Sequence, residues 1–136
     1  LGELAGPLSN GVQVMQTYTF MGDMDPKKQA LWEKIKTKYG LKNPAEVKMG
    51  SGVGNAYDAV HIIAKAIEKA GAYDWKKVRE ALYGVNHEGL VASYKPAFDA
   101  ADPERQDAIL PRDYKLTVWS DGKLVPIEQT TYGKAK

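Results

Sequence analysis

The chain has 136 residues, 43% of them hydrophobic and 26% charged, a composition typical of a folded globular domain or of part of one. The net charge is only +2, and the 19 basic residues are scattered among 17 acidic ones, which argues against a nucleic-acid-binding protein. Cysteine is absent, which excludes disulfides and thiol chemistry, and no apolar run approaches the roughly 18 residues of a membrane-spanning helix.

The first segment is predicted to be a loop followed by one strand. Residues 1–11 contain three glycines, a proline and an asparagine, which favours loop. No initiator methionine precedes Leu1 and no signal-peptide pattern follows it, so we expect the chain to be a fragment of a longer protein. Residues 12–20 are rich in Val, Thr, Tyr and Phe and are predicted to form a strand.

A first helix is predicted from Pro26 to Gly40, with Asp25 as its N-cap. Its apolar stripe consists of Leu31, Ile35 and Tyr39, supported by Trp32. Its charged side chains are expected to face water, namely Lys27, Lys28, Glu33, Lys34, Lys36 and Lys38. A short helical turn is predicted after Asn43-Pro44.

The central element is predicted in residues 49–71, as a glycine-rich loop followed by a helix. Asn55 is its predicted N-cap, Asp58 falls in the first turn, and Gly71 is the predicted end. The buried face is expected to be Ala56, Ala59, Val60, Ile63, Ala64 and Ile67, widened by Ile62, Ala66 and Ala70.

The remaining elements are a shorter helix, a strand and a hairpin. Asp74 is predicted to cap a helix that Gly84 ends, and residues 90–98 are predicted to form a strand that Pro96 places at an edge or ends early. Residues 99–112 favour loop. Residues 114–119 and 123–128 alternate around Asp121-Gly122, which indicates a hairpin.

No residues have the spacing that catalysis or cofactor binding needs. His61 and His87 have no partner at metal-ligand spacing, and the acidic residues between 99 and 107 lack the order of a calcium loop. The glycines of residues 50–54 could hold an anion, but the Lys-Ser ending of a phosphate loop is missing. We therefore expect no enzyme, no metal and no cofactor.

The order of the elements resembles the carboxyl-terminal third of a known family. The chain is similar to the type I periplasmic solute-binding proteins, in the branch that serves branched-chain amino acid (Leu/Ile/Val) ABC importers. The resembling stretches are NGVQVMQTYTF, DPKKQALWEKIKTKYG, NAYDAVHIIAKAIEKAG, DWKKVREAL, HEGLVASYKPAFD and LPRDYKLTVWSDGKLVPI.

The resemblance implies an α/β fold of two lobes joined by three crossovers, with ligand held in the cleft between them. This chain would be an incomplete part of that fold, with three main helices and a C-terminal β-hairpin. Residues 1–113 would belong to the amino-terminal lobe and include a crossover strand. Residues 114–136 would form the hairpin of the other lobe, with a tail.

The resemblance also implies a function without catalysis. The protein would bind a small carboxylate, an amino acid or an aromatic acid, in the periplasm or as an extracellular lipoprotein, and would partner an ABC permease. One alternative is a ligand-sensing domain of the same fold in a regulator, and another is a small α/β enzyme. Sequence upstream of Leu1 would distinguish transport from sensing, and an activity that needs His61 or His87 would favour the enzyme.

Four residues are candidate ligand contacts. Family members that take branched-chain amino acids can have a bulky aromatic residue three positions before the tyrosine that matches Tyr57, and this chain has Gly54 there. The smaller residue favours a larger or flatter ligand, such as an aromatic carboxylate. Phe20, Met21 and Asn55 are candidates because they lie near the hinge and cleft; the alternatives are core packing for Phe20 and Met21 and helix capping for Asn55.

A fragment of this kind would leave strand edges and apolar surface uncovered. Such surfaces favour association with another chain. We therefore expect these 136 residues, on their own, to form a dimer or an oligomer with exchanged elements.

Overall fold

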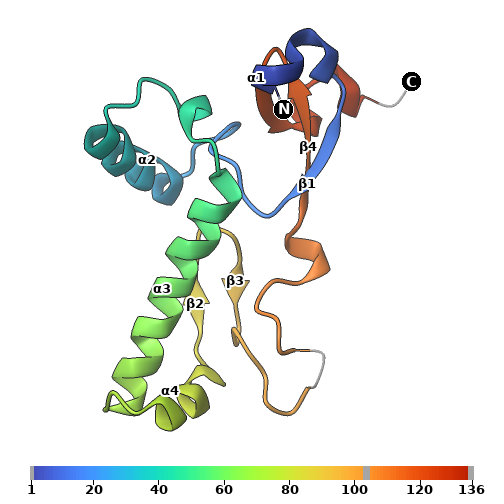
Figure 1. Ribbon diagram of the computed structural model, residues 1–136. Coiled ribbons are helices and arrows are strands. Elements are labelled where there is room, and N and C mark those ends of the chain that lie inside the picture. Colours follow the sequence, from blue (N-terminus) through green and yellow to red (C-terminus); the bar gives the residue numbers. More distant parts are fainter. Residues whose placement is uncertain (1, 103–104, 135–136) are drawn as a thin grey trace. The chain divides into compact units, whose positions relative to one another are not determined.

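The computed structural model describes residues 2–102 and 105–134, and it divides into two compact units (Figure 1). Unit 1 comprises Leu1–Gly52 together with Tyr114–Lys136, and unit 2 comprises Val53–Asp113. The predicted division into lobe portions, residues 1–113 and 114–136, stays a prediction.

Unit 1 is built on a three-stranded antiparallel sheet in the order β1-β4-β5. The strands are β1 (Gln13–Gln16), β4 (Lys115–Ser120) and β5 (Lys123–Pro126). Asp121 and Gly122 join β4 to β5 with φ values of 50° and 74°, as a two-residue turn with two left-handed positions requires. The predicted hairpin is therefore confirmed.

The amino-terminal residues differ from the prediction in two ways. Short helical turns, α1 (Gly2–Ala5) and a 3-10 turn (Gly6–Ser9), replace the expected loop. The strand covers four residues rather than 12–20, because its pairing with β4 ends where Gln16 faces Lys115. Beyond Gln16 the chain bends away from the sheet.

Helix α2 (Pro26–Tyr39) confirms the predicted capping signals. The carboxylate of Asp25 accepts from the backbone N–H groups of Lys27 and Lys28, at 2.9 and 3.0 Å. Gly40 ends the helix with φ 65°. The predicted stripe is only partly buried, since Trp32 is enclosed whereas Tyr39 is 64% exposed.

Lys28 was expected to face water and is instead 6% exposed. Its ammonium donates to the carbonyl oxygens of Met21 and Asp23, at 2.7 and 2.9 Å. The prediction was wrong because helical periodicity treats a lysine as an outward residue, whereas nearby carbonyls of an irregular segment can satisfy a buried ammonium. The predicted turn after Asn43 is confirmed as a 3-10 turn (Pro44–Glu46).

Unit 2 packs a hairpin and a short helix against one long helix. Figure 1 shows α3 (Gly50–Ala70), most of which lies in unit 2, running beside the hairpin of β2 (His87–Glu88) and β3 (Ser93–Tyr94), with α4 (Trp75–Leu82) near its end. Asp74 caps α4 by accepting from the N–H of Lys77. The buried hydrophobic cluster is Ile62, Ala66, Ala81, Val85, Tyr94 and Ala97.

The start and the buried face of α3 both correct the sequence analysis. The helix begins at Gly50, so the glycine-rich segment is helical and Asn55 lies inside the helix rather than at its N-cap. The buried positions repeat every four residues, namely Gly54, Asp58, Ile62 and Ala66. Gly71 follows with φ 63°, as predicted.

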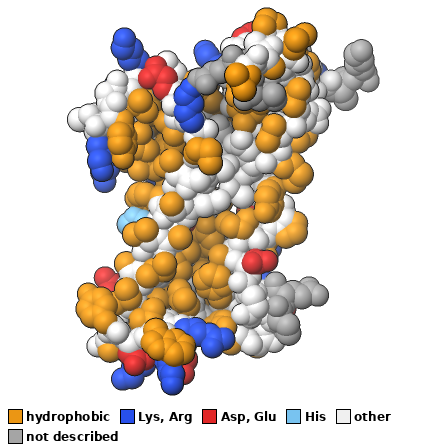
Figure 2. Space-filling model, viewed as in Figure 1, with side chains coloured by type: hydrophobic (Ala, Val, Ile, Leu, Met, Phe, Trp, Pro, Cys, Tyr) orange, Lys and Arg blue, Asp and Glu red, His pale blue; other side chains and the backbone are white. Residues whose placement is uncertain are grey.

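Of the residues predicted as buried on α3, Ile62 and Ala66 are buried, whereas the main predicted stripe is largely exposed. Val60 is 66% exposed and Ile63 47% exposed. The prediction left Asp58 out of the buried face because it is charged. The main predicted stripe therefore lay on a different side of the helix from the observed buried face. Figure 2 shows hydrophobic side chains reaching the surface of the molecule over both units.

The strand predicted for residues 90–98 is only β3, and its partner β2 was not predicted. Strands of two residues are too short to show alternation. Short 3-10 turns complete the chain at Pro111–Asp113, Ile127–Gln129 and Thr131–Gly133. Among the described residues, no helix combines the length and apolar character needed to cross a membrane.

Candidate functional site

Unit 1 contains a cavity of about 330 Å³. Its walls come from the chain after β1, from the turn after Asn43 and the start of α3, and from the β4–β5 hairpin. The lining residues are Gln16, Thr19, Phe20, Met21, Pro44, Ala45, Val47, Lys48, Gly50, Trp119, Gly122, Lys123 and Leu124. A volume of this size is at the lower end of those that hold small ligands.

Hydrogen bonds hold the walls of this cavity together. The hydroxyl of Ser51 donates to the carbonyl oxygen of Tyr18 at 3.0 Å and to the side-chain oxygen of Gln16 at 3.3 Å, which ties the start of α3 to the end of β1. The hydroxyl of Thr19 accepts from the N–H of Met21 at 3.1 Å and donates to the carbonyl of Leu124 at 3.5 Å. The segment after β1 is therefore fixed to both neighbouring walls.

The lining combines aromatic and apolar side chains with two cations. Phe20 and Trp119 supply rings, and Lys48 and Lys123 supply positive charge. Among the lining residues, all of which the structure describes, none is acidic. Such a lining is suited to a small anion with an apolar body, because a carboxylate can meet an ammonium while the rest of the ligand meets rings.

The structure brings two of the four candidate contacts together. Phe20 and Met21 both line the cavity. Phe20 is also 2% exposed, with its ring edge-on to Tyr18 at a centroid distance of 5.2 Å, so it also packs in the interior of unit 1. Gly54 and Asn55 lie on α3 in unit 2 and do not line this cavity; Gly54 is buried and Asn55 half-buried.

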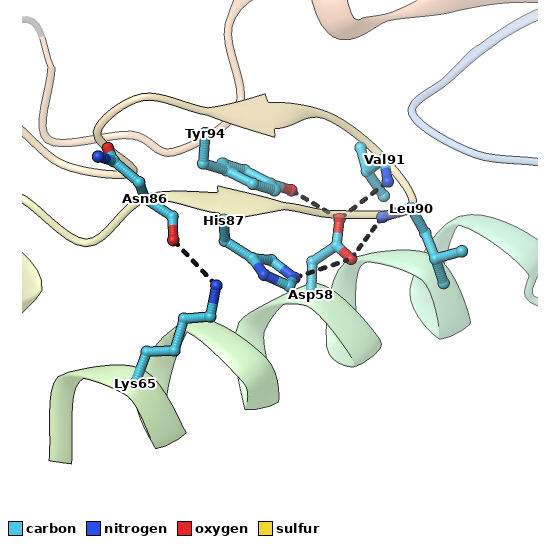
Figure 3. A network of polar contacts seen from close by, with 7 residues as sticks. All are labelled: Asp58, Lys65, Asn86, His87, Leu90, Val91 and Tyr94. Atoms are coloured by element: carbon cyan, nitrogen blue, oxygen red, sulfur yellow. Dashed lines mark hydrogen bonds and ion pairs between the residues drawn. The ribbon is translucent and has the colours of Figure 1, made fainter. Parts of the chain in front are cut away.

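Unit 2 contains a second polar arrangement, centred on the carboxylate of Asp58 (Figure 3). Asp58 is 1% exposed and accepts from the backbone N–H groups of Leu90 at 2.7 Å and Val91 at 2.8 Å, and from the hydroxyl of Tyr94 at 3.0 Å. The ring nitrogen Nε2 of His87 lies 3.9 Å from the carboxylate. These contacts attach the β2–β3 hairpin to α3.

Burial and the neighbouring Asp58 carboxylate both raise the pKa of Tyr94 well above its ordinary value. The tyrosine therefore stays protonated and donates to the carboxylate. Gly89 sits so close to this carboxylate that a Cβ there would collide with it. Sequence reasoning missed the arrangement, although a glycine between two strands and an aspartate on a helix are its only sequence signals.

The histidines do not indicate a metal site. The ring of His61 lies 4.5 Å from that of Tyr57 and 5.5 Å from that of His87, centroid to centroid. Within residues 2–102 and 105–134, no group of three or more potential ligand side chains could hold a metal ion. The hydrogen bonds of Asp58 make it an anchor for the hairpin.

The sequence has a relative among known binding proteins. It is 42% identical, over 79 residues, to the leucine-, isoleucine-, valine-, threonine- and alanine-binding protein of Pseudomonas aeruginosa. The match covers 58% of this chain and 19% of that protein. No family model matches the sequence.

The fold has solved counterparts. A leucine-binding protein from Thermotoga maritima superimposes with a TM-score of 0.66 at 25% identity, over 90% of this chain and 31% of its own. This is the carboxyl-terminal part of the type I periplasmic solute-binding protein fold. The predicted α/β class, with three main helices and a C-terminal hairpin, is confirmed.

A second solved structure of this fold contains a bound ligand. It is a solute-binding protein of an ABC transporter from Rhodopseudomonas palustris in complex with p-hydroxybenzoic acid, with a TM-score of 0.57 and 25% identity over 91% of this chain and 31% of its own. The chain therefore spans a fifth to a third of the length of these solute-binding proteins. None of the three is named as an enzyme, in agreement with the prediction of no catalysis.

Proposed function

We propose that the protein carrying this sequence binds a small carboxylate outside the cytoplasm and delivers it to an ABC permease. The observation that carries the proposal is the agreement of two matches, one in sequence to an amino acid-binding protein and one in fold to solute-binding proteins. The periplasm, or an extracellular lipoprotein, is the proposed location. A sensing domain of the same fold is the alternative.

The proposed ligand is an aromatic carboxylate. Three features support this choice: the small residue Gly54 in place of a bulky aromatic one, the aromatic and cationic lining of the cavity, and the p-hydroxybenzoic acid bound by a relative. Phe20 and Met21 are the proposed contacts in the cavity of unit 1. Gly54 and Asn55 do not line that cavity and stay candidate contacts that rest on the resemblance.

Calorimetric titration of the full-length protein with 4-hydroxybenzoate and with leucine tests the ligand class. We expect 4-hydroxybenzoate to bind at least about tenfold more tightly, a difference of roughly 1.4 kcal/mol. Tight binding of leucine without binding of 4-hydroxybenzoate would overturn the aromatic proposal but leave solute binding intact. Binding of neither compound would count against the carboxylate class.

A charge reversal tests the cavity. Lys123→Glu places a negative charge in the lining, so 4-hydroxybenzoate should bind at least about tenfold more weakly. Lys134→Glu makes the same change at an exposed lysine outside the lining and should leave the affinity within about twofold. Equal effects of the two variants would remove Lys123 from the ligand site.

Self-association of the 136-residue chain stays a prediction. Its support is the exposure of large apolar side chains, including Val60 at 66% and Trp75 at 70%. Size-exclusion chromatography with light scattering measures the molar mass directly. A well-folded monomer would refute the prediction.

A further inference from the structure

Lys28 is a buried lysine of unit 1, and it is hydrogen-bonded to the main chain of a residue of the cavity wall. Its ammonium donates to the carbonyl oxygen of Met21 at 2.7 Å and to that of Asp23 at 2.9 Å. Met21 lines the cavity, whereas Lys28 does not. The lysine therefore acts on the cavity only through the main chain of Met21.

The peptide groups on both sides of Met21 are fixed by side chains. Its N–H donates to the hydroxyl of Thr19 at 3.1 Å, and its carbonyl oxygen accepts from Lys28. Thr19 also lines the cavity. This segment belongs to neither β1 nor α2, so the hydrogen bonds of a regular element do not hold it. The side chains of Thr19 and Lys28 therefore fix the main-chain position of Met21.

The turn after Met21 is closely packed as well. Gly22 has φ 82°, and a Cβ there would lie 2.8 Å from the ring of Pro126. Gly22 therefore lies close to Pro126 of β5, with no room for a larger residue, and Lys28 of α2 is hydrogen-bonded to the residues on either side of it.

The position is an unfavourable one for a lysine. It lies in the first turn of α2, where the helix dipole disfavours a cation, and burial lowers the pKa of its ammonium despite the nearby carboxylates of Asp25 and Asp23. Lys115 adds further positive charge nearby and lowers it more. The compensating contacts are the two carbonyls and the ring of Tyr18, whose centroid lies 6.0 Å from the ammonium.

We propose that Lys28 is a positioning residue, which fixes the main chain at Met21 and thereby sets the shape of the cavity wall that meets the ligand. The inference rests on the proposed function where it concerns ligand, but the position of Met21 can be measured without any ligand. A methionine side chain is flexible and adapts to an irregular wall, so its main chain is the part that Lys28 can hold in place.

The first experiment follows the methyl signal of Met21 by NMR, in the full-length protein labelled with methyl-13C methionine. Met21→Leu identifies this signal. Lys28→Met is unsuitable here because it adds another methionine methyl, so Lys28→Leu is compared with Lys34→Leu, an exposed lysine of the same helix. We expect Lys28→Leu to shift or broaden the Met21 signal and Lys34→Leu to leave it in place.

Lys28→Arg supplies the rescue, because a guanidinium can donate to two carbonyls. It should return the Met21 signal toward its wild-type position. Where Lys28→Leu does not fold, Thr19→Val removes the hydrogen bond on the other side of Met21 and should displace the same signal. A Met21 signal that neither shifts nor broadens in Lys28→Leu would overturn the proposal. Where that variant does not fold, an unchanged signal in Thr19→Val would do so.

The second experiment measures the affinity of the full-length protein for 4-hydroxybenzoate. Lys28→Leu should weaken binding about tenfold, Lys28→Arg should restore most of it, and Lys34→Leu should have no effect. A displaced Met21 signal with unchanged affinity would overturn the link between Lys28 and ligand. If the wild-type protein does not bind the compound, the proposed function fails, and the methyl signals still decide whether Lys28 positions Met21.

Discussion

Among the residues that the structure describes, each unit buries one charged side chain, and the two differ in sign and in surroundings. Lys28 in unit 1 is a cation held by two carbonyl oxygens, beside a cavity. Asp58 in unit 2 is an anion held by two N–H groups and a tyrosine hydroxyl, above the buried apolar cluster. Both charges are satisfied mainly by main-chain groups, which removes the need for an opposite charge in contact.

The difference shows how a buried charge can serve distinct purposes. Asp58 joins a helix to a hairpin and completes a core, so its loss should affect stability most. Lys28 holds an irregular segment at a cavity, so its loss should affect the shape of the cavity more than the stability of the fold. The following substitutions test this contrast.

The largest effect is expected from Asp58→Ala. It leaves the N–H groups of Leu90 and Val91 and the hydroxyl of Tyr94 without their acceptor, at a cost of about 3–5 kcal/mol. Urea denaturation monitored by circular dichroism measures the change. Glu68→Ala, an exposed acid on the same helix, should change stability by less than about 0.5 kcal/mol; similar values for the two would show that Asp58 is no anchor.

Gly89→Ala disturbs the same carboxylate by adding a methyl group to the hairpin that it anchors. The added Cβ would collide with Asp58, and displacing the hairpin should cost roughly 1–3 kcal/mol. Gly52→Ala is the matched control, because its Cβ would meet only Met49 at an ordinary 3.7 Å, inside a helix where alanine is favoured. A destabilised Gly52→Ala together with an unaffected Gly89→Ala would contradict this account.

Lys28→Met should cost about 1–2 kcal/mol at neutral pH, since two hydrogen bonds are lost but the burial of a charge is relieved. Because burial lowers the pKa of Lys28 below 10.5, the unfolded chain binds more protons between the folded pKa and 10.5. The unfolding free energy of the wild type should therefore increase, through Lys28, as the pH rises from the folded pKa toward 10.5. Urea titrations at a series of pH values should show that the variant lacks this gain.

Tyr94→Phe should have the smallest effect, about 1 kcal/mol, because Asp58 keeps two of its donors. The pKa of Tyr94 is raised, so its contribution is complete below the unfolded value near 10 and is lost as pH rises above it. The difference in unfolding free energy between the wild type and Tyr94→Phe should therefore shrink as the pH rises above 10. A difference that stays constant above pH 10 would rule out this linkage.

The elements that could be predicted from the sequence are those fixed by local chemistry. Asp25-Pro26 and Asp74 cap their helices, and Asp121-Gly122 forms its turn, because each signal acts within a few residues. The buried face of α3 could not be predicted in the same way. Its orientation depends on Asp58, whose donors lie more than 30 positions further along the chain.

The resemblance proposed Phe20 and Met21 as ligand contacts, and both residues line one cavity. Their contact with a ligand stays a prediction. The partners that complete this cavity, such as Trp119 and Lys123, come from the hairpin about 100 residues later, and no local pattern connects them to Met21. Lys28 was missed because a lysine in an amphipathic helix normally faces solvent.

The two units also differ in how their residues are distributed along the chain. Unit 2 is continuous, whereas β1 finds its partner only in β4, where Val14 faces Thr117. During synthesis on the ribosome, unit 2 can therefore fold before β4, the partner of β1, has been synthesised. A premature stop before residue 115 would remove the partner of β1 but leave the Asp58 anchor and its hairpin whole.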